Sequence, residues 1–188
     1  MFQSKRLTYR KLGDKDFQTF YELYSNKEVM KYTYFDAFLS LEEAKNAFQE
    51  VLVKQDDESQ GTQYIVTLTN NEDIGIVDYD VIIKNFEGGI FELGYFIKPQ
   101  YWGYGFGTEM SETFIGFLFE NHNIHKIVAS CNSNNSSSEH IMKKLGMTYE
   151  GSLRKVRLKN GVWEDETKYG LLREEWEANK VRACEDEL

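Results

Sequence analysis

The spacing of apolar residues changes along the chain, and each change predicts a helix or a strand. Apolar side chains recur every three or four residues after Asp14 and again after Ser40, which predicts two amphipathic helices. Ser40 and Glu43 form a capping box at the start of the second helix. A third helical stretch follows a glycine-rich segment, and a fourth covers 135–145 and ends at Gly146.

Shorter apolar runs that are rich in β-branched and aromatic residues predict the strands. Two pairs of these runs are joined by turn residues, at 70–73 and 159–161, which predicts two hairpins. The runs cover residues 6–10, 64–69, 74–83, 90–97, 126–131, 147–158 and 163–172. Since strands both surround and alternate with helices, we expect an α/β or α+β fold with a mixed sheet. The chain of 188 residues has no repeat or linker, so we expect one domain over 1–176 and a polar tail over 177–188.

The composition narrows the class of partner. The net charge of −9 leaves no basic stripe for a phosphate backbone, which argues against nucleic-acid binding. No apolar run approaches the roughly 20 residues that span a bilayer, and the first residues lack a signal-peptide core. We therefore expect a cytoplasmic protein that does not insert into a membrane. Cys131 and Cys184 fit a reducing compartment. His122, His125 and His140 show no metal-ligand pattern, so no metal is expected.

Three glycines alternate with aromatic residues in the stretch YWGYGFGTEM, residues 101–110, just before a predicted helix. Glycines let the backbone approach a ligand closely, and a helix start directs free N–H groups and a positive dipole end at the same place. Together these features predict an anion site that suits phosphate. Thr108 stands where a dinucleotide fingerprint needs its third glycine, and no Walker lysine follows. A tight turn without a ligand is the alternative.

The segment Trp102 to Gly107 resembles the pyrophosphate-binding motif of the GNAT N-acetyltransferases, Gln/Arg-x-x-Gly-x-Gly/Ala, with Trp102 in the place of Gln or Arg. Three further segments, NKEVMKY, NNSSSEHIMKKLGMTYEG and NGVWEDETKYGLLREEW, resemble the RimJ/RimL branch in order and spacing. The resemblance implies the GNAT fold, in which a mostly antiparallel sheet with splayed middle strands is flanked by helices. It also implies acetyl-CoA as co-substrate. The residues that it implies as contacts of acetyl-CoA are Phe96, Ile97, Lys98, Trp102, Gly103, Tyr104, Gly105, Phe106, Gly107, Thr108, Asn135 and Ser138.

Acetyl transfer to an amine needs a proton acceptor for the amine and a proton donor for the leaving thiolate. Glu92 lies four residues before Phe96, so both side chains are expected on one side of the strand, and Glu92 is the candidate base, acting through a water molecule. The resemblance gives the donor role to Ser138, because Met142 occupies the position where other branches place a tyrosine acid.

Each candidate site residue has an alternative role. Glu92 also fits a solvated strand carboxylate, and Asn135 and Ser138 also fit a helix cap, with Ser136 and Glu139 forming a capping box. A nucleophilic cysteine at 131 is a further option for the transfer.

The branch resemblance implies direct transfer from acetyl-CoA to a primary amine, with the N-terminal α-amine of a ribosomal protein as the first acceptor. Polyamines, amino acids, antibiotics and other small amines are the alternatives, because fold and cofactor site do not fix the acceptor. A non-catalytic acyl-CoA sensor and a nucleotide-binding module are the rivals from other classes. A homodimer is compatible with the family.

Overall fold

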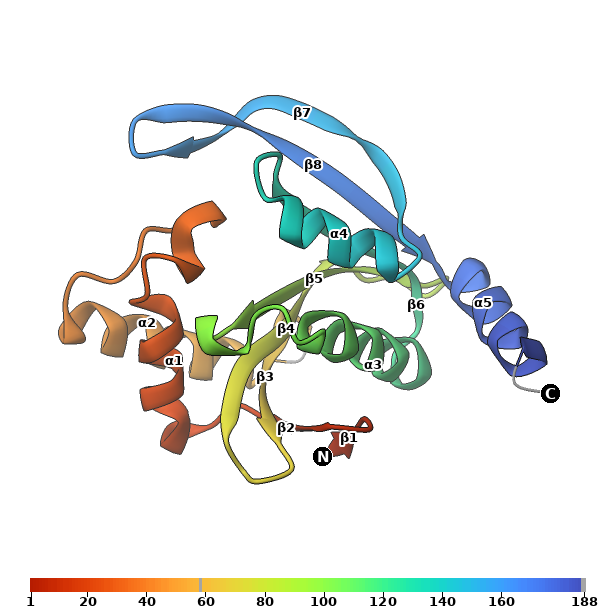
Figure 1. Cartoon of the computed structure of the whole chain (residues 1–188), viewed down its shortest axis with the longest axis horizontal. Coiled ribbons are helices and arrows are strands. Elements are labelled where there is room, and N and C mark those ends of the chain that lie inside the picture. Colours follow the sequence, from red (N-terminus) through yellow and green to blue (C-terminus); the bar gives the residue numbers. More distant parts are fainter. Residues whose placement is uncertain (58, 187–188) are drawn as a thin grey trace.

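A computed structural model describes residues 1–57 and 59–186, and the chain forms one sheet with helices on both faces (Figure 1). The strands lie in the order β1-β2-β3-β4-β5-β6-β8-β7. Their bounds are Phe2–Gln3, Leu7–Lys11, Gly61–Leu68, Asp73–Ile83, Gly89–Ile97, Ile124–Asn132, Val162–Leu172 and Thr148–Lys159, in that same order. Neighbouring strands run antiparallel except β5 and β6, which are parallel. The mixed, mostly antiparallel sheet that the sequence predicts is therefore confirmed.

The four predicted helices are present in the predicted order, and a fifth follows the last strand. They are α1 (Phe17–Tyr24), α2 (Leu41–Lys54), α3 (Phe106–Asn121), α4 (Ser136–Lys144) and α5 (Arg173–Asp186), with short 3₁₀ turns η1 (Asp14–Asp16), η2 (Val29–Tyr32) and η3 (Pro99–Tyr101). The cap predicted for α2 is present, since Ser40 Oγ accepts the N–H of Glu43 at 3.1 Å. None of the described helices is both long and apolar enough to cross a membrane.

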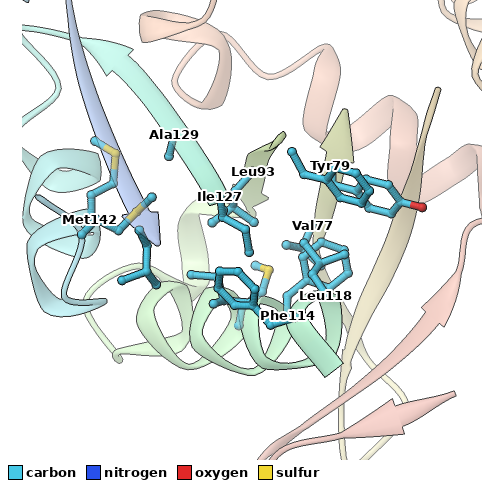
Figure 2. Close-up of a cluster of buried hydrophobic side chains, with 14 of the residues drawn as sticks. Val77, Tyr79, Leu93, Phe114, Leu118, Ile127, Ala129 and Met142 are labelled. Atoms are coloured by element: carbon cyan, nitrogen blue, oxygen red, sulfur yellow. The ribbon is translucent and has the colours of Figure 1, made fainter. Parts of the chain in front are cut away.

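Two apolar clusters hold the helices on the sheet. The larger lies between the sheet and α3 and α4, and Figure 2 shows its labelled members Val77, Tyr79, Leu93, Phe114, Leu118, Ile127, Ala129 and Met142. The smaller lies on the opposite face, where Phe20 and Phe48 of α1 and α2 pack on Ile65 and Ile76. Because side chains alternate along a strand, β4 and β5 send one set of residues to each cluster. The two faces therefore differ in the helices that cover them.

The last strands form a long hairpin that arches over α4 in Figure 1. Asn160 and Gly161 in its turn have φ angles of 50° and 76°, the left-handed conformation that Asn-Gly favours, so the predicted hairpin is confirmed. The chain then continues as α5, which takes up most of the segment predicted as a polar tail. Trp176 of α5 stacks on Phe119 of α3 with ring centroids 5.0 Å apart. The boundary at residue 176 stays a prediction, and residues 187–188 of the tail lie outside the described residues.

Candidate active site

A gap opens in the middle of the sheet where β5 and β6 separate. Their parallel pairing runs from Gly89 with Ile124 to Glu92 with Val128, whereas β5 continues to Ile97 and β6 to Asn132. The N–H of Lys98 donates to the carbonyl of Ile74, so even-numbered residues of β5 direct their amides toward β4. The amides of Tyr95 and Ile97 therefore face the gap. The amide of Phe96, a residue that the resemblance implies as a contact, does not face the gap, because strand alternation turns it toward Ile76.

The glycine-rich segment lies between the open end of β5 and the first turn of α3. Gly103 and Gly105 have φ angles of 81° and 78°, and Gly105 is the N-cap of α3. A Cβ at Gly103 would meet nothing within 4 Å, and one at Gly105 would meet only the Arg6 guanidinium at 3.7 Å. Both glycines thus leave open space in front of the helix N-terminus, as an anion site requires. Thr108 is half-buried in the first turn.

Gly107 has a different role from the other two glycines. It is buried, and a Cβ on it would lie 2.7 Å from Ile141 Cδ1 and 3.2 Å from Ile97 Cδ1. The missing side chain lets α3 pack against α4 at the end of β5. The N-termini of both helices are thereby brought to the open ends of β5 and β6, so two positive dipole ends border the gap.

Two aromatic side chains of the segment fix its shape. The indole Nε1 of Trp102 donates to the carbonyl of Ile97 at 2.8 Å, which closes the turn after β5. Tyr104 is exposed, and its carbonyl accepts from Arg6 Nη1 at 3.2 Å. Lys98 is drawn away from the loop by an ion pair with Glu22 of α1, with 2.8 Å between Nζ and Oε2.

Arg6 contacts the glycine-rich segment, and the sequence patterns did not indicate this contact. Its guanidinium lies 4.3 Å from the ring centroid of Phe106, and its Nε donates to Glu109 Oε2 at 2.5 Å. The arginine thus places a cation beside Gly105 and neutralises an acidic residue in the first turn of α3. It precedes the loop by about a hundred positions, and no local pattern signals the contact.

Replacing Gly105 by Val is expected to weaken CoA binding at least ~10-fold, or about 1.4 kcal/mol, because the side chain fills the space in front of the helix N-terminus. Calorimetric titration with CoA measures the effect. Gly161→Val is the matched control: Gly161 has a φ of 76° and open space around it, but lies in the hairpin turn. It therefore carries the same backbone strain without the loss of affinity. Equal CoA affinity in folded Gly105→Val and wild-type protein contradicts the phosphate-loop assignment.

The N-terminus of α4 holds Asn135 and Ser138 together. Asn135 is the N-cap, and its Oδ1 accepts the N–H of Ser138 at 3.1 Å. The predicted capping box of Ser136 and Glu139 is wrong, because Ser136 is already the first helical residue and lies exposed. Asn135 takes the cap because it is the last residue with non-helical backbone before α4.

Tyr95 reaches Ser138 from β5. The two hydroxyl oxygens lie 2.6 Å apart, and the Tyr95 hydroxyl also donates to the carbonyl of Ser138 at 3.2 Å. Burial raises the pKa of Tyr95, so this phenol keeps its proton beside Ser138. A tyrosine hydroxyl is thus present at the α4 terminus, although it comes from β5 and not from the helix position that Met142 occupies.

The cysteine at 131 is free, 5% exposed and next to Ser138. Burial raises the pKa of the Cys131 thiol to about 11, which is the opposite of what a nucleophilic cysteine needs. The side chain of Cys184 lies outside the described residues. Among the residues that the structure describes, no three His, Cys, Asp or Glu side chains form a group that could hold a metal ion.

Glu92 lies at the last β5–β6 pair, on the face of the sheet opposite α3 and α4. Its Oε1 accepts from Ser130 Oγ of β6 at 2.5 Å, and the side chain is half-buried. Phe96 shares this face and packs on Tyr24 of α1, with ring centroids 5.0 Å apart. The expectation that Glu92 and Phe96 share a side is confirmed. Glu92 and Ser138 lie on opposite faces, beside the same gap.

The long hairpin of β7 and β8 borders the face of the sheet on which Glu92 lies. Arg157 of β7 is buried, pairs with Glu166 of β8 at 2.8 Å and lies 3.6 Å from the ring centroid of Tyr34. Lys159 pairs with Asp36 at 2.9 Å. The hairpin is therefore tied to the segment between η2 and α2, and the two border the side of the gap where Glu92 lies.

The comparison with known proteins agrees with this geometry. The family model of the acetyltransferase (GNAT) domain matches residues 6–148. The chain belongs to the GNAT acetyltransferase family. It is an N-acetyltransferase that uses acetyl-CoA as its co-substrate. The loop of open glycines, the two helix N-termini and the gap between β5 and β6 are the parts of this GNAT domain that suit the phosphates and the thioester arm.

Three similar proteins illustrate the range of the family. An uncharacterized N-acetyltransferase of Bacillus subtilis, YnaD, is 34% identical over 92% of this chain and 97% of its own. The structure of a spermidine N-acetyltransferase from Vibrio cholerae with CoA and spermine has a TM-score of 0.81 at 22% identity, covering 92% and 99% of the two chains. RimL, a ribosomal L7/L12 α-N-protein acetyltransferase in complex with CoA, has a TM-score of 0.79 at 18% identity, covering 92% and 97%.

Proposed function

We propose that this enzyme transfers the acetyl group of acetyl-CoA to a primary amine of a small polycation, such as a polyamine, by direct attack within a ternary complex. The observation that carries the proposal is the acidic face around the gap. Because the helix N-termini on the α3 and α4 side suit the cofactor phosphates, the amine approaches from the other face. That face carries Asp78, Asp80, Glu92, Glu164 and Glu166.

Three of these carboxylates form no direct ion pair with a described residue, although the charge of Lys54 acts on Asp78 and that of Arg157 acts on Glu92 and Glu164. Asp80 pairs with Lys54, and Glu166 pairs with Arg157 and Lys168. Glu92 accepts from Ser130 and Glu164 accepts from Asn132, and Asp78, Glu92 and Glu164 make no ion pair with any described residue. A polyamine brings several ammonium groups, which these carboxylates can neutralise, whereas an N-terminal α-amine brings one.

In this proposal each site residue has a defined task. The Gly103 and Gly105 loop holds the pyrophosphate, and the amides of Tyr95 and Ile97 hold the pantetheine arm and the thioester carbonyl. Glu92 accepts a proton from the reacting nitrogen, and Ser138 donates one to the thiolate.

The N-terminal α-amine of a ribosomal protein is the second candidate acceptor. The likeness of the fold to RimL favours it, since that structure is of a ribosomal protein acetyltransferase. Assembly as a homodimer stays a prediction for both acceptors.

The two acceptors are distinguished by measuring free thiol released from acetyl-CoA. Spermidine and spermine are compared with lysine, with a small monoamine and with peptides that copy ribosomal N-termini. We expect kcat/KM for the polyamines to exceed that for the monoamine at least ~10-fold, which is about 1.4 kcal/mol of extra binding in the transition state. The advantage should shrink as salt rises, because the attraction is electrostatic. A preference for the peptides instead supports the α-amine acceptor, and no thiol release with any amine contradicts the proposal.

A further inference from the structure

Asp78 of β4 is a second carboxyl beside the gap, and sequence analysis did not identify it. The register of β4 and β5 places Asp78 opposite Gly94 and Asp80 opposite Glu92. Asp78 is therefore the diagonal neighbour of Glu92 on the same face of the sheet, a position from which side chains reach each other.

Gly94 explains where the carboxyl group lies. A Cβ on Gly94 would come within 2.1 Å of Asp78 Oδ1 and 3.0 Å of its Cγ. The Asp78 carboxyl thus occupies the space that a side chain at position 94 would fill. Since the β5–β6 pairing ends at Glu92, Gly94 lies where the two strands have begun to separate. The glycine lets a side chain from β4 lean across β5 to the edge of the gap.

The charged and polar groups around Asp78 come from each element packed against it. Tyr24 faces it from α1, Lys54 from α2, Asp80 from β4 and Glu92 from β5, and its partner in register on β3 is Gln63. Tyr24 does not serve Asp78 as a hydrogen-bond partner, and its hydroxyl accepts from Gln63 Nε2 at 3.3 Å. Within the described part of the chain, Asp78 has neither a hydrogen-bond donor nor an ion pair.

This environment changes the acidity of the group. Burial, helped by the charges of Asp80 and Glu92 and opposed by that of Lys54, raises the pKa of Asp78 to about 7. A carboxyl group with a pKa near 7 is partly ionised at neutral pH and binds a proton more strongly than an ordinary aspartate.

An amine acceptor needs such a group. A primary amine with a pKa of about 10.4 is present as the free base in roughly one molecule in 10³ at pH 7. The ammonium ion must lose a proton before its nitrogen can attack, and the adduct must lose another when it collapses.

We propose that Asp78 is a second proton acceptor of this reaction, which removes the proton that the acceptor ammonium loses before attack. The free amine then forms the C–N bond at the thioester carbonyl. Glu92 takes the second proton from the nitrogen of the adduct, the C–S bond breaks, and the thiolate receives a proton from Ser138. Asp78 and Glu92 return their protons to solvent, and Ser138 regains one from it. This assignment rests on the proposed transfer to an amine.

The pH dependence of turnover separates the two carboxylates. With spermidine at saturation, wild-type turnover should rise as pH passes through about 7, where Asp78 loses its proton. Asp78→Asn should lose about 10²-fold at pH 7 and recover to within ~3-fold by pH 10, where roughly a quarter of the amine is present as free base. Glu92→Gln should keep its defect at both pH values. Asp14→Asn is the matched control, since it makes the same change on an exposed residue of η1, outside the acidic face.

Gly94→Ala tests the geometry without removing the charge. The φ of Gly94 lies outside the left-handed region, so alanine fits the backbone, but its Cβ displaces the Asp78 carboxyl from the edge of the gap. We expect Gly94→Ala to lower turnover at pH 7 at least ~10-fold and to recover at pH 10 as Asp78→Asn does.

Thermal melting supplies a readout that does not depend on activity. A carboxyl whose folded pKa is raised stabilises the fold less as pH rises from its ordinary value of 3.8 toward about 7. Asp78→Asn does not lose stability in this way. Its melting temperature should therefore rise relative to that of wild type between pH 5 and pH 8. Asp14→Asn should show no such gain.

Failure of the role of Asp78 and failure of the proposed function give different results. Absence of transfer to every amine by the wild-type enzyme overturns the proposed function. Normal transfer by wild type, with an Asp78→Asn defect that is missing or that persists unchanged at pH 10, overturns the role of Asp78 alone. Wild-type turnover in folded Gly94→Ala overturns it as well.

Discussion

Glu92→Gln is expected to lower turnover by roughly 10²–10⁴-fold, while CoA affinity stays close to wild type. The amide cannot accept the proton that the nitrogen loses, and the side chain lies on the face opposite α3 and α4. Ser130 Oγ can still donate to the carbonyl oxygen of the new side-chain amide, so the local hydrogen bond survives the change. Steady-state thiol release and calorimetric titration with CoA measure the two quantities.

The same variant predicts a shift in pH dependence. The negative charge of Glu92 contributes to the raised pKa of Asp78, behind burial and Asp80. Removing that charge should lower the pKa of Asp78, so the acidic limb of the remaining turnover moves to lower pH. Turnover within a few-fold of wild type at pH 7 would mean that Glu92 is only a strand carboxylate.

Ser138→Ala is expected to cut turnover by about 10²-fold or more, while the melting temperature and CoA affinity remain nearly unchanged. The cap of α4 uses the backbone N–H of Ser138 and the side chain of Asn135, so alanine leaves the cap intact. The lost hydroxyl is the one that lies 2.6 Å from Tyr95 Oη and is available to protonate the thiolate.

Two neighbouring variants serve as controls for Ser138. Asn135→Ala removes the cap and should cost about 0.5–2 kcal/mol of folding free energy, with turnover retained at saturating acetyl-CoA. Ser136→Ala changes an exposed hydroxyl and should alter neither quantity. All three variants are compared by thermal melting and by thiol release. Full turnover in Ser138→Ala contradicts the donor role, and the thiolate then takes its proton from Tyr95 or from water.

Local features of the fold follow directly from the sequence. The Ser40 cap, the Asn160-Gly161 turn and the two hairpins depend on residues within a few positions of one another, so short patterns report them well. The α4 cap shows the limit of such patterns. Both Asn135 and Ser136 are good cap residues, and the backbone geometry after β6 decides between them.

The glycine loop that we propose for the cofactor phosphates was visible in the same way. Its alternating glycines and the helix behind them form one continuous stretch, so their position and their suitability for phosphate could be predicted before any contact was known. The roles of the individual glycines could not be predicted from the sequence. Gly107 packs against Ile141 and Ile97, and only the approach of α4 shows that it serves packing while Gly103 and Gly105 leave open space.

The sequence by itself determined the order of the elements between residues 6 and 172, the glycine loop and the strand carboxylate Glu92. These features depend on residue type and on the spacing of near neighbours. The tertiary structure decided which residues meet across the gap. Arg6 reaches the glycine loop, Tyr95 reaches Ser138, and Asp78 lies in the space above Gly94. Strand order and register bring these distant pairs together, and the burial that raises the pKa of Asp78 exists only once the sheet has formed.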